Sequence, residues 1–450
     1  MTNIMPKRPD GRPRTSPATV SLERIAELGI VGAGGGGFPT AAKLATRVST
    51  VIVNGAECEP LLHKDKELLH HLAEPMLRGL SAAMALVGAH VGIIGIKEKY
   101  TDVMAGLEPV LPSGVRILPL PDSYPAGDEF LLVYDAVGRI IPPGGLPKDV
   151  DTAVANVETL VNIGLDEPVT HKYLTIAGAI AAPVTLRVPI GMSIDEVIAR
   201  AGGATVADFD VLMGGVMMGR LADGLDEAVT KTLGGLVVLP TSHPLVGRYR
   251  ATPRQIARIG RSACDQCRFC TDLCPRYLIG HPIEPHRAMQ SLGFSSSPAS
   301  MVAGTLYCCE CNLCSLYSCP ENLDPKNVCA ASKPVAREMG LIWSGSAESV
   351  EPHPLAADRR VPMKRLISRL GLTDFHNVGP LEDLGVTPRR VVLPLKQHAG
   401  APALPAVRPG DRVSMGDLVA APASGALGAR IHASIAGVVR SVDAAVVIEA

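Results

Sequence analysis

Two short cysteine runs carry the most specific spacing in this chain, and thiolates at that spacing bind iron. The first run reads Cys264-x2-Cys267-x2-Cys270-x3-Cys274-Pro275. The second reads Cys308-x2-Cys311-x2-Cys314-x4-Cys319-Pro320, one residue longer before its last cysteine. Three thiolates two residues apart can bind three corners of a cubane, with the fourth supplied by a distant segment. Each run therefore predicts a [4Fe–4S] cluster.

The fourth ligands are expected to cross between the runs, as they do in ferredoxins that hold two clusters. This rule gives the first cluster to Cys264, Cys267, Cys270 and Cys319, and the second to Cys308, Cys311, Cys314 and Cys274. Zinc is the alternative, but zinc sites usually take cysteines in pairs. The extra Cys309 is expected to be a buried small hydrophobic residue and not a ligand.

Composition limits the classes of protein to which this chain could belong. Its 450 residues exceed one core, so three or four domains are expected. A net charge of -1 and an aromatic content of 3% give no basis for nucleic-acid binding. Ten of the eleven cysteines fall within residues 264–329, unlike a disulfide scaffold. Clusters and free thiols need a reducing compartment, which predicts a cytoplasmic protein.

The N-terminal residues 1–20 are basic and proline-rich, which predicts a disordered tail and not a secretory signal. The longest apolar stretches, at residues 84–96 and 174–186, are too short to span a bilayer. The sequence therefore predicts no transmembrane segment.

A glycine-rich loop follows a short helix predicted at residues 21–28. The four consecutive glycines Gly34, Gly35, Gly36 and Gly37 let backbone N–H groups approach an anion closely. Lys43, on the predicted helix after the loop, adds a positive charge. The loop lacks the Gly-Lys-Ser/Thr of a Walker A motif.

Polar residues follow the strand predicted at residues 50–53. The segment after it contains Asn54, Glu57 and Glu59. Open α/β sheets bind ligands at the carboxyl ends of their strands, so these side chains predict a ligand site there. The alternative for the two glutamates is a solvated strand end.

The glycine loop GAGGGGFPTAAK and the segment NGAECEP together resemble the flavin subunit of respiratory complex I, which binds FMN and NADH. They resemble the C subunit of Rnf electron-transport complexes even more closely. Further matches follow in order at residues 124–129 (YPAGDE), 142–147 (PPGGLP) and 156–159 (NVET). This series of motifs in the same order makes a chance match improbable.

This resemblance implies FMN as a cofactor and NADH as the electron donor. It implies that Gly34 to Gly37 and Lys43 hold the FMN phosphate, and that Asn54, Glu57 and Glu59 lie near the isoalloxazine and the nicotinamide. The two glutamates are the residues predicted to be catalytic. The flavin pocket would be lined by Tyr124, Gly127, Asp128 and Glu129, and closed by Asn156 and Thr159. Ala33 departs from the pattern, since complex I has an arginine in this loop.

These motifs predict a multidomain α/β and α+β protein. A Rossmann-like FMN domain at residues 21–165 would precede a β-grasp (SLBB) domain at 166–245, which we expect to bridge flavin and clusters. An α-helical two-cluster ferredoxin-like module would span 246–335, and a connector 336–385. Residues 386–450 resemble a barrel-sandwich hybrid domain. We expect no carrier function for it, because its one lysine, Lys396, precedes the Gly-Asp hairpin.

Domain order separates this chain from the Rnf C subunit, in which the barrel-sandwich domain comes first. A barrel-sandwich domain at the end resembles the cobalamin reductases of propanediol-utilisation microcompartments (the PduS type). The segment Asp374-Phe-His376-Asn-Val-Gly379 also fits the D-x-H-x-x-G pattern of proteins that ligate cobalt through histidine. The helical character of the preceding residues favours the alternative of a connector loop with an exposed histidine.

The resemblance implies transfer of electrons from NADH through FMN and two [4Fe–4S] clusters to cob(III)alamin or cob(II)alamin. Its implied partners are cobalamin, or a corrinoid bound to an adenosyltransferase, and microcompartment shell proteins. The implied location is the cytoplasm, inside a bacterial microcompartment. One alternative is an Rnf-like subunit that transfers electrons between NADH and ferredoxin. Another is an electron-wire protein without an NADH site.

Overall fold

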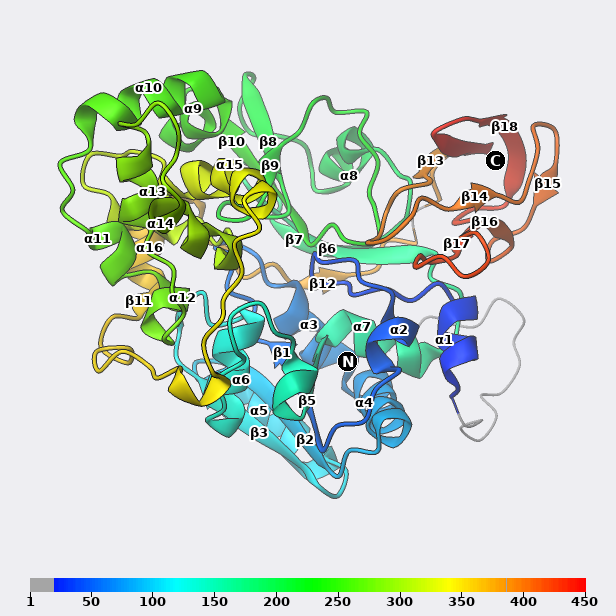
Figure 1. Ribbon diagram of the computed structural model, residues 1–450. Coiled ribbons are helices and arrows are strands. Elements are labelled where there is room, and N and C mark those ends of the chain that lie inside the picture. Colours follow the sequence, from blue (N-terminus) through cyan, green and yellow to red (C-terminus); the bar gives the residue numbers. More distant parts are fainter. Residues whose placement is uncertain (1–19, 386) are drawn as a thin grey trace.

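The computed structural model describes residues 20–385 and 387–450 (Figure 1). All of the predicted N-terminal tail except Val20 lies outside the described residues. Figure 1 shows the N-terminal α/β domain at the bottom and a helical module at the upper left. A second sheet lies above the first domain, and a small β-rich domain lies at the right.

The N-terminal domain is built on a parallel sheet in the order β3-β2-β1-β5. Its strands are β1 (Thr50–Gly55), β2 (Val91–Lys97), β3 (Val115–Leu120) and β5 (Thr152–Asn156). The central strands are buried along most of their length, as expected of a parallel sheet covered on both faces. The helices are α1 (Leu22–Glu27), α2 (Thr40–Leu44), α3 (Lys64–His71), α4 (Ala73–Val87), α5 (Thr101–Leu107), α6 (Glu129–Val137) and α7 (Val157–Leu165).

Helices α4 and α7 touch through their backbones, and two glycines make this possible. A Cβ atom on Gly79 would lie 1.9 Å from the carbonyl oxygen of Leu160. A Cβ atom on Gly164 would lie 1.8 Å from the carbonyl oxygen of Pro75. No side chain fits at either distance, so this close helix pair requires glycine at both positions.

The second domain is a mixed sheet in the order β12-β7-β6-β10-β8-β9. Strands β6 and β7 pair antiparallel, at the positions where the sequence predicts a hairpin. Ser193 caps the helix of this domain by accepting the backbone N–H of Glu196. The elements are β6 (His171–Gly178), β7 (Val184–Pro189), α8 (Ile194–Arg200), β8 (Phe209–Met213), β9 (Arg220–Leu221), β10 (Gly235–Pro240) and β12 (Leu381–Glu382).

The cluster module is helical, and its two cysteine runs end in different kinds of helix. The first run passes through α11 (Phe269–Asp272), whereas residues Cys314–Ser318 of the second form a π-helical turn. A π turn accommodates one extra residue, which accounts for the longer spacing before Cys319. The other helices are α9 (Pro244–Arg250), α10 (Pro253–Ala263), α12 (Pro275–Leu278), α13 (Pro285–Ser291), α14 (Ala299–Val302) and α15 (Pro325–Glu338).

Residues between the cluster module and the last domain contribute short strands to two other domains. Strand β11 (Val361–Pro362) pairs with β4 (Ser123–Tyr124) of the N-terminal domain, which is called the flavin-type domain below. Helix α16 (Met363–Arg369) follows it directly, and β12 then joins the second domain beside β7. The segment predicted as a connector is therefore hydrogen-bonded to both domains.

The C-terminal domain holds two small sheets, in the orders β13-β19-β18-β15 and β14-β16-β17. Alternating buried residues of β13 and β19 face the core between them, as in a sandwich. The strands are β13 (Arg390–Pro394), β14 (Leu404–Pro405), β15 (Arg412–Val413), β16 (Leu418–Ala421), β17 (Ile431–His432), β18 (Gly437–Val442) and β19 (Ala445–Glu449).

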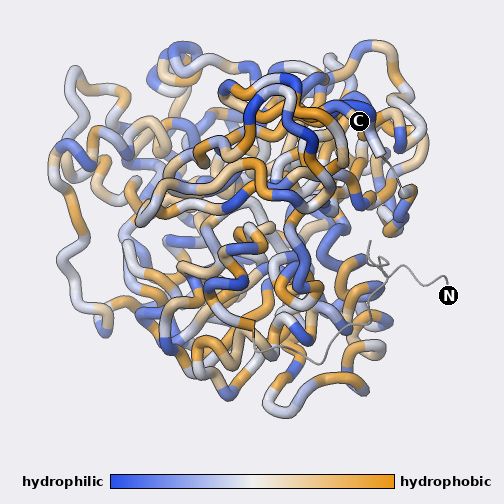
Figure 2. Tube along the Cα trace, turned by 90° about the vertical axis from the view of Figure 1, so that its right-hand side faces the viewer, coloured by the Kyte–Doolittle hydropathy of each residue, from blue (hydrophilic) through white to orange (hydrophobic). Residues whose placement is uncertain are grey.

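Hydrophobic and hydrophilic segments alternate along the coloured part of the trace in Figure 2. Among the residues that the structure describes, none of the helices combines the length and the apolar character needed to cross a bilayer.

Lys231 joins three domains at one buried point. Its Nζ donates to the carbonyl oxygens of Gly29 and Arg430, each at 2.7 Å. The side chain is only 2% exposed, and no carboxylate within residues 20–385 and 387–450 forms an ion pair with it. Burial lowers the pKa of Lys231 to about 7, since the ammonium loses water and gains no counter-charge.

We expect the Lys231→Met variant to show a weaker dependence of stability on pH than the parent protein. Between the folded pKa of about 7 and the ordinary pKa of 10.5, the unfolded chain holds a proton that the folded chain lacks. Stability of the parent therefore rises with pH across this window, by up to about 1.4 kcal/mol per pH unit.

The measurement is urea unfolding at several pH values for the parent, Lys231→Met and Lys148→Met, which removes an exposed lysine. The difference between parent and Lys231→Met should grow in favour of the parent from pH 7 upward. A pH-independent difference would contradict a neutral Lys231.

Candidate functional site

The carboxyl ends of β1 and β5 meet at the point where the sheet order reverses. The chain moves from β1 to β2 on one side, while β5 pairs with β1 on the other. Asn54 and Asn156 are direct register partners at these ends. Doubly wound folds bind ligands at such a switch point, so the structure brings two predicted site residues together where a ligand is expected.

Both asparagines are fixed by hydrogen bonds to neighbouring motifs. Asn54 Nδ2 donates to the carbonyl oxygen of Gly127 at 2.8 Å, and Asn156 Nδ2 donates to Asp65 Oδ2 at 2.8 Å. A Cβ atom on Gly127 would lie 3.2 Å from Cys58 Sγ, so glycine allows this motif to pack on the strand end. Asn156 also caps α7 by accepting the backbone N–H of Glu158.

The glycine loop is anchored at its start and open at its middle. The Ala33 N–H donates to Thr159 Oγ1 at 2.9 Å, and the Ala33 carbonyl accepts from Lys172 Nζ at 2.9 Å. A Cβ atom added to Gly35 or Gly36 would have no atom within 4 Å. This open stretch of backbone fits the approach of a phosphate, so the residues present fit FMN.

Lys43, predicted to hold the phosphate, forms an ion pair with another predicted site residue. Its Nζ lies 2.7 Å from Glu129 Oε1, and each side chain is about one-third exposed. Its ammonium is therefore already shared with a carboxylate. The predicted phosphate contact of Lys43 remains a proposal.

A group of buried charged side chains lies next to the glycine loop and the strand ends. Lys172 and Lys64 both contact Glu158, and Lys64 also contacts Asp65. Burial lowers the pKa of Lys172 to about 8, opposed by the Glu158 carboxylate. Lys172 comes from the second domain and reaches the glycine loop, so the two domains share one charge network.

The two glutamates predicted to be catalytic already have backbone partners. Glu59 accepts the N–H groups of Met217 and Met218 at 2.9 and 2.8 Å, and Glu57 accepts the N–H of Asp65. Burial raises the pKa of Glu59 to about 7 and that of Glu57 to about 8, the latter with help from Asp65. Both carboxyls titrate near neutral pH, which suits proton transfer, while their catalytic role remains a proposal.

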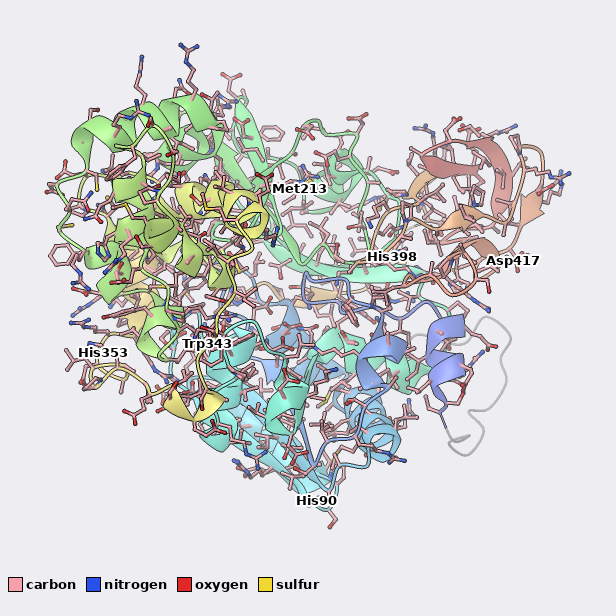
Figure 3. The ribbon with its side chains drawn as sticks, in the orientation of Figure 1. His90, Met213, Trp343, His353, His398 and Asp417 are labelled. Atoms are coloured by element: carbon pink, nitrogen blue, oxygen red, sulfur yellow. The ribbon has the colours of Figure 1, made fainter. Side chains whose placement is uncertain are left out.

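The loop of Met217 and Met218, which binds the Glu59 carboxylate, also contacts the cluster module. Asn312 Nδ2, between two cysteines of the second run, donates to the carbonyl oxygen of Met217 at 3.1 Å. Tyr249 Oη of α9 donates to the same oxygen at 3.0 Å. The second domain thus contacts both the N-terminal domain and the segment of the second cysteine run. Its predicted bridging role remains a proposal. Figure 3 labels Met213, which ends β8 just before this loop.

The motif at residues 124–129 lies against the second cysteine run. Tyr124 Oη donates to the carbonyl oxygen of Cys311 at 2.6 Å. Asp128 caps α6 through the N–H groups of Phe130 and Leu131, and its other oxygen lies 2.8 Å from Arg276 Nη2. The predicted pocket residues Tyr124 and Asp128 therefore face the cluster module directly.

The thiols predicted to hold the first cluster surround one cavity. Cys264, Cys267, Cys270 and Cys319 all line one small pocket, together with residues such as His286 and Met289. Burial raises the pKa of Cys270 to about 12, and the neighbouring Cys264, Cys319 and Cys267 add to this shift. This arrangement fits a [4Fe–4S] cluster with one ligand from the other run.

The thiols predicted to hold the second cluster also lie together. Burial raises the pKa of Cys314 well above its usual value, and Cys308 and Cys274 add to the shift. In the described part of the chain, no three His, Cys, Asp or Glu side chains are close enough to hold a single metal ion. Thiols around a cubane stand farther apart than around one zinc ion, because the cluster itself separates them.

Cys309 and Cys329 accompany the second cluster set. Cys309 lies beside Cys311 and raises its pKa, and Cys308 lies beside Cys329 and raises its pKa. Cys329 is fully buried, whereas Cys309 is partly buried. In the predicted ligand set, neither residue binds iron.

The segment Asp374–His376 lies on the surface after α16. Residues Thr373–Phe375 form a short 3-10 turn, and the side chain of His376 is exposed. A preceding helix and an exposed histidine match the connector-loop interpretation.

Three features of the site were not predicted from the sequence. The role of Lys172 depends on a contact with residue 33, and the loop at Met217 reaches Glu59 across the chain. Arg276, directly after the Cys274-Pro275 pair, is buried against Asp128 and lies 3.6 Å from the Phe130 ring centroid. A charged residue beside a cluster motif could have flagged Arg276.

We expect Arg276→Met to destabilise the protein by about 3 kcal/mol, because the Asp128 carboxylate would lose its buried counter-charge. Chemical unfolding of the parent, Arg276→Met, Asp128→Asn and the double variant would measure this coupling. The double variant should be more stable than the sum of the single losses predicts. Additive losses would show that the ion pair contributes nothing of its own.

The C-terminal domain approaches the glycine loop. The Ala399 N–H donates to the carbonyl oxygen of Gly37 at 2.9 Å, and Figure 3 places His398 where this domain meets the rest of the chain. A Cβ atom on Gly37 would lie 3.2 Å from the Cα atom of His398. The C-terminal domain therefore packs against the glycine loop at Gly37, away from the cysteine runs.

Family models match four parts of the chain. They are the Nuo51 FMN-binding domain at residues 25–165 and the SLBB domain at 173–221. A 4Fe-4S dicluster domain matches residues 263–324, and the RnfC barrel sandwich hybrid domain matches 377–450. The chain thus carries an FMN-binding domain and a domain for two [4Fe–4S] clusters, in the predicted order.

Curated relatives cover nearly the whole chain. A protein named cobalamin reductase PduS from Citrobacter freundii is 44% identical over 425 residues, which is 93% of this chain and 94% of the relative. Its counterpart in Salmonella typhimurium is 44% identical over 94% of each chain. The C subunit of the Na(+)-translocating ferredoxin:NAD(+) oxidoreductase complex of Acetobacterium woodii is 34% identical, covering 60% of this chain and 61% of the relative.

Proposed function

The chain belongs to the family of the PduS cobalamin reductases, and we propose that it uses NADH to reduce the cobalt of a corrinoid. When bound, FMN converts the electron pair of a hydride into single electrons, which two [4Fe–4S] clusters can carry. Reduction of cob(III)alamin and cob(II)alamin would regenerate adenosylcobalamin with an adenosyltransferase inside a bacterial microcompartment. Shell proteins are further proposed partners.

The observation that carries this proposal is the direct contact between the flavin-site motif and the module that contains both cysteine runs. Tyr124 donates to the carbonyl oxygen of Cys311, and Asp128 pairs with Arg276, which follows the predicted ligand Cys274 by two residues. Electron transfer requires the donor and acceptor sites to be close. The chain's own side chains hold them together at a buried interface.

Residues of the switch point would position the flavin and the nicotinamide. The open backbone of Gly35 and Gly36 would bind the phosphate, with Gly34, Gly37 and Lys43 beside it. Asn54 and Asn156 present fixed amides at the strand ends, and Glu57 and Glu59 have pKa values near neutral pH, where burial has placed them. These carboxyls could hold or release a proton as the redox state changes.

The test is to mix anaerobic, reconstituted protein with NADH, hydroxocobalamin, ATP and an adenosyltransferase, and to follow the corrinoid spectrum. Formation of adenosylcobalamin supports the proposal. NADH-dependent bleaching of the flavin without corrinoid reduction would favour an Rnf-like exchange with ferredoxin, which the Acetobacterium relative suggests. Absence of bleaching would favour the electron-wire alternative without an NADH site.

A further inference from the structure

A groove beside the clusters is not used by the proposed flavin site. It is a shallow groove, open to solvent, between α16 and the two cysteine runs. One side presents Phe269, Tyr317 and Ser318. The other presents Lys364, Arg365 and Arg369, so every charged side chain that lines the groove is basic.

The groove reaches the first cluster through neighbouring residues. Phe269 stands between the ligands Cys267 and Cys270, and Ser318 directly precedes Cys319. Arg369 Nη2 donates to the carbonyl oxygen of Cys319 at 3.3 Å. A molecule in the groove would therefore contact the residues that surround this cluster.

Exposure also distinguishes the two clusters. Each predicted set has one half-buried cysteine, Cys264 or Cys308, and the others are buried except Cys267. Cys267 is exposed and belongs to the first set, whereas no cysteine of the second set is exposed. The second run is the one that contacts the flavin-type domain, through Tyr124 and Cys311. The first cluster is thus the one nearer to solvent, as the last carrier before an external acceptor must be.

We propose that this groove binds the corrinoid substrate, an inference that rests on the proposed function. Phe269 is 51% exposed and, with Tyr317, offers aromatic surface to a flat macrocycle. Lys364 and Arg365 are exposed on α16 and can bind the phosphodiester of the nucleotide loop. Each cobalt reduction takes one electron, and oxidation of NADH supplies electrons in pairs.

Binding can be measured without turnover. Equilibrium dialysis of hydroxocobalamin against the holoprotein, with no NADH present, gives a dissociation constant for each variant. Phe269→Ala and the double variant Lys364→Glu/Arg365→Glu should each raise it at least tenfold. The matched control is Arg254→Glu/Arg258→Glu, which reverses two exposed charges on α10 of the same module and should leave the constant unchanged.

Iron and flavin contents of each variant show whether the cofactors are in place. Unchanged binding in the groove variants, or no binding of free corrinoid by the parent, would overturn the proposal. The second result would indicate that a partner protein presents the substrate. Failure of the proposed function is separate, since it appears as a parent protein that does not reduce corrinoid with NADH at all.

Discussion

Replacing one predicted ligand of either cluster by alanine should halve the iron content, from about eight to about four atoms per chain. Cys270→Ala tests the first cluster and Cys314→Ala tests the second. A cubane bound by three thiolates and an alanine position is open to solvent and oxidation, so we expect loss of that cluster. NADH-driven corrinoid reduction should fall at least a hundredfold in both variants, because each interrupts the electron path.

Paired substitutions test the crossing of ligands between the runs. If Cys274 binds the second cluster, Cys274→Ala/Cys314→Ala loses one cluster and keeps about four irons, whereas Cys270→Ala/Cys274→Ala loses both. Ligation within each run would reverse these two results. Cys309→Ala and Cys329→Ala are the controls, and loss of iron in either would make that cysteine a ligand.

The cysteine spacing was sufficient to predict the cluster module, because local spacing identifies the three thiols that each run can give to one cubane. The cavity lined by Cys264, Cys267, Cys270 and Cys319 gathers residues that the ferredoxin rule had grouped. The π-helical turn at Cys314–Ser318 was not predicted, although the extra residue before Cys319 was visible. Several backbone conformations can absorb one residue, and only the packing around the turn selects among them.

The contacts between domains could not be read from the sequence. Glu59 lies near the flavin motifs in the chain, yet Met217 and Met218 of the second domain bind its carboxylate. Nothing in the sequence around Lys172 and Lys231 indicated that they are buried, yet both are buried where domains meet. Such contacts depend on how whole domains pack, whereas motifs and periodicity report on local structure.

The segment at residues 336–385 illustrates the same limit. Its two-residue strands β11 and β12 are too short to show alternation, so a connector was the natural prediction. The structure pairs them with β4 and β7, which places α16 beside the cysteine runs. The proposed substrate groove exists only because of this pairing.

The Gly36→Val variant should lose FMN while remaining folded. A Cβ atom at Gly36 would meet no protein atom within 4 Å, so the side chain disturbs no contact of the folded chain. The same side chain would occupy the space into which a phosphate must move to reach the loop N–H groups. We expect FMN affinity to fall at least a hundredfold, or about 2.7 kcal/mol, measured by titration of the reconstituted apoprotein.

Gly106→Val is the matched control, because Gly106 lies in α5, where an added Cβ likewise meets no atom within 4 Å. This control should bind FMN as the parent does. Iron content and thermal unfolding should be unchanged in both variants, since the clusters lie in another domain. Normal FMN binding by Gly36→Val would place the phosphate elsewhere and remove the glycine loop from the site, whereas joint loss of FMN, iron and stability would show that the valine disturbs the fold.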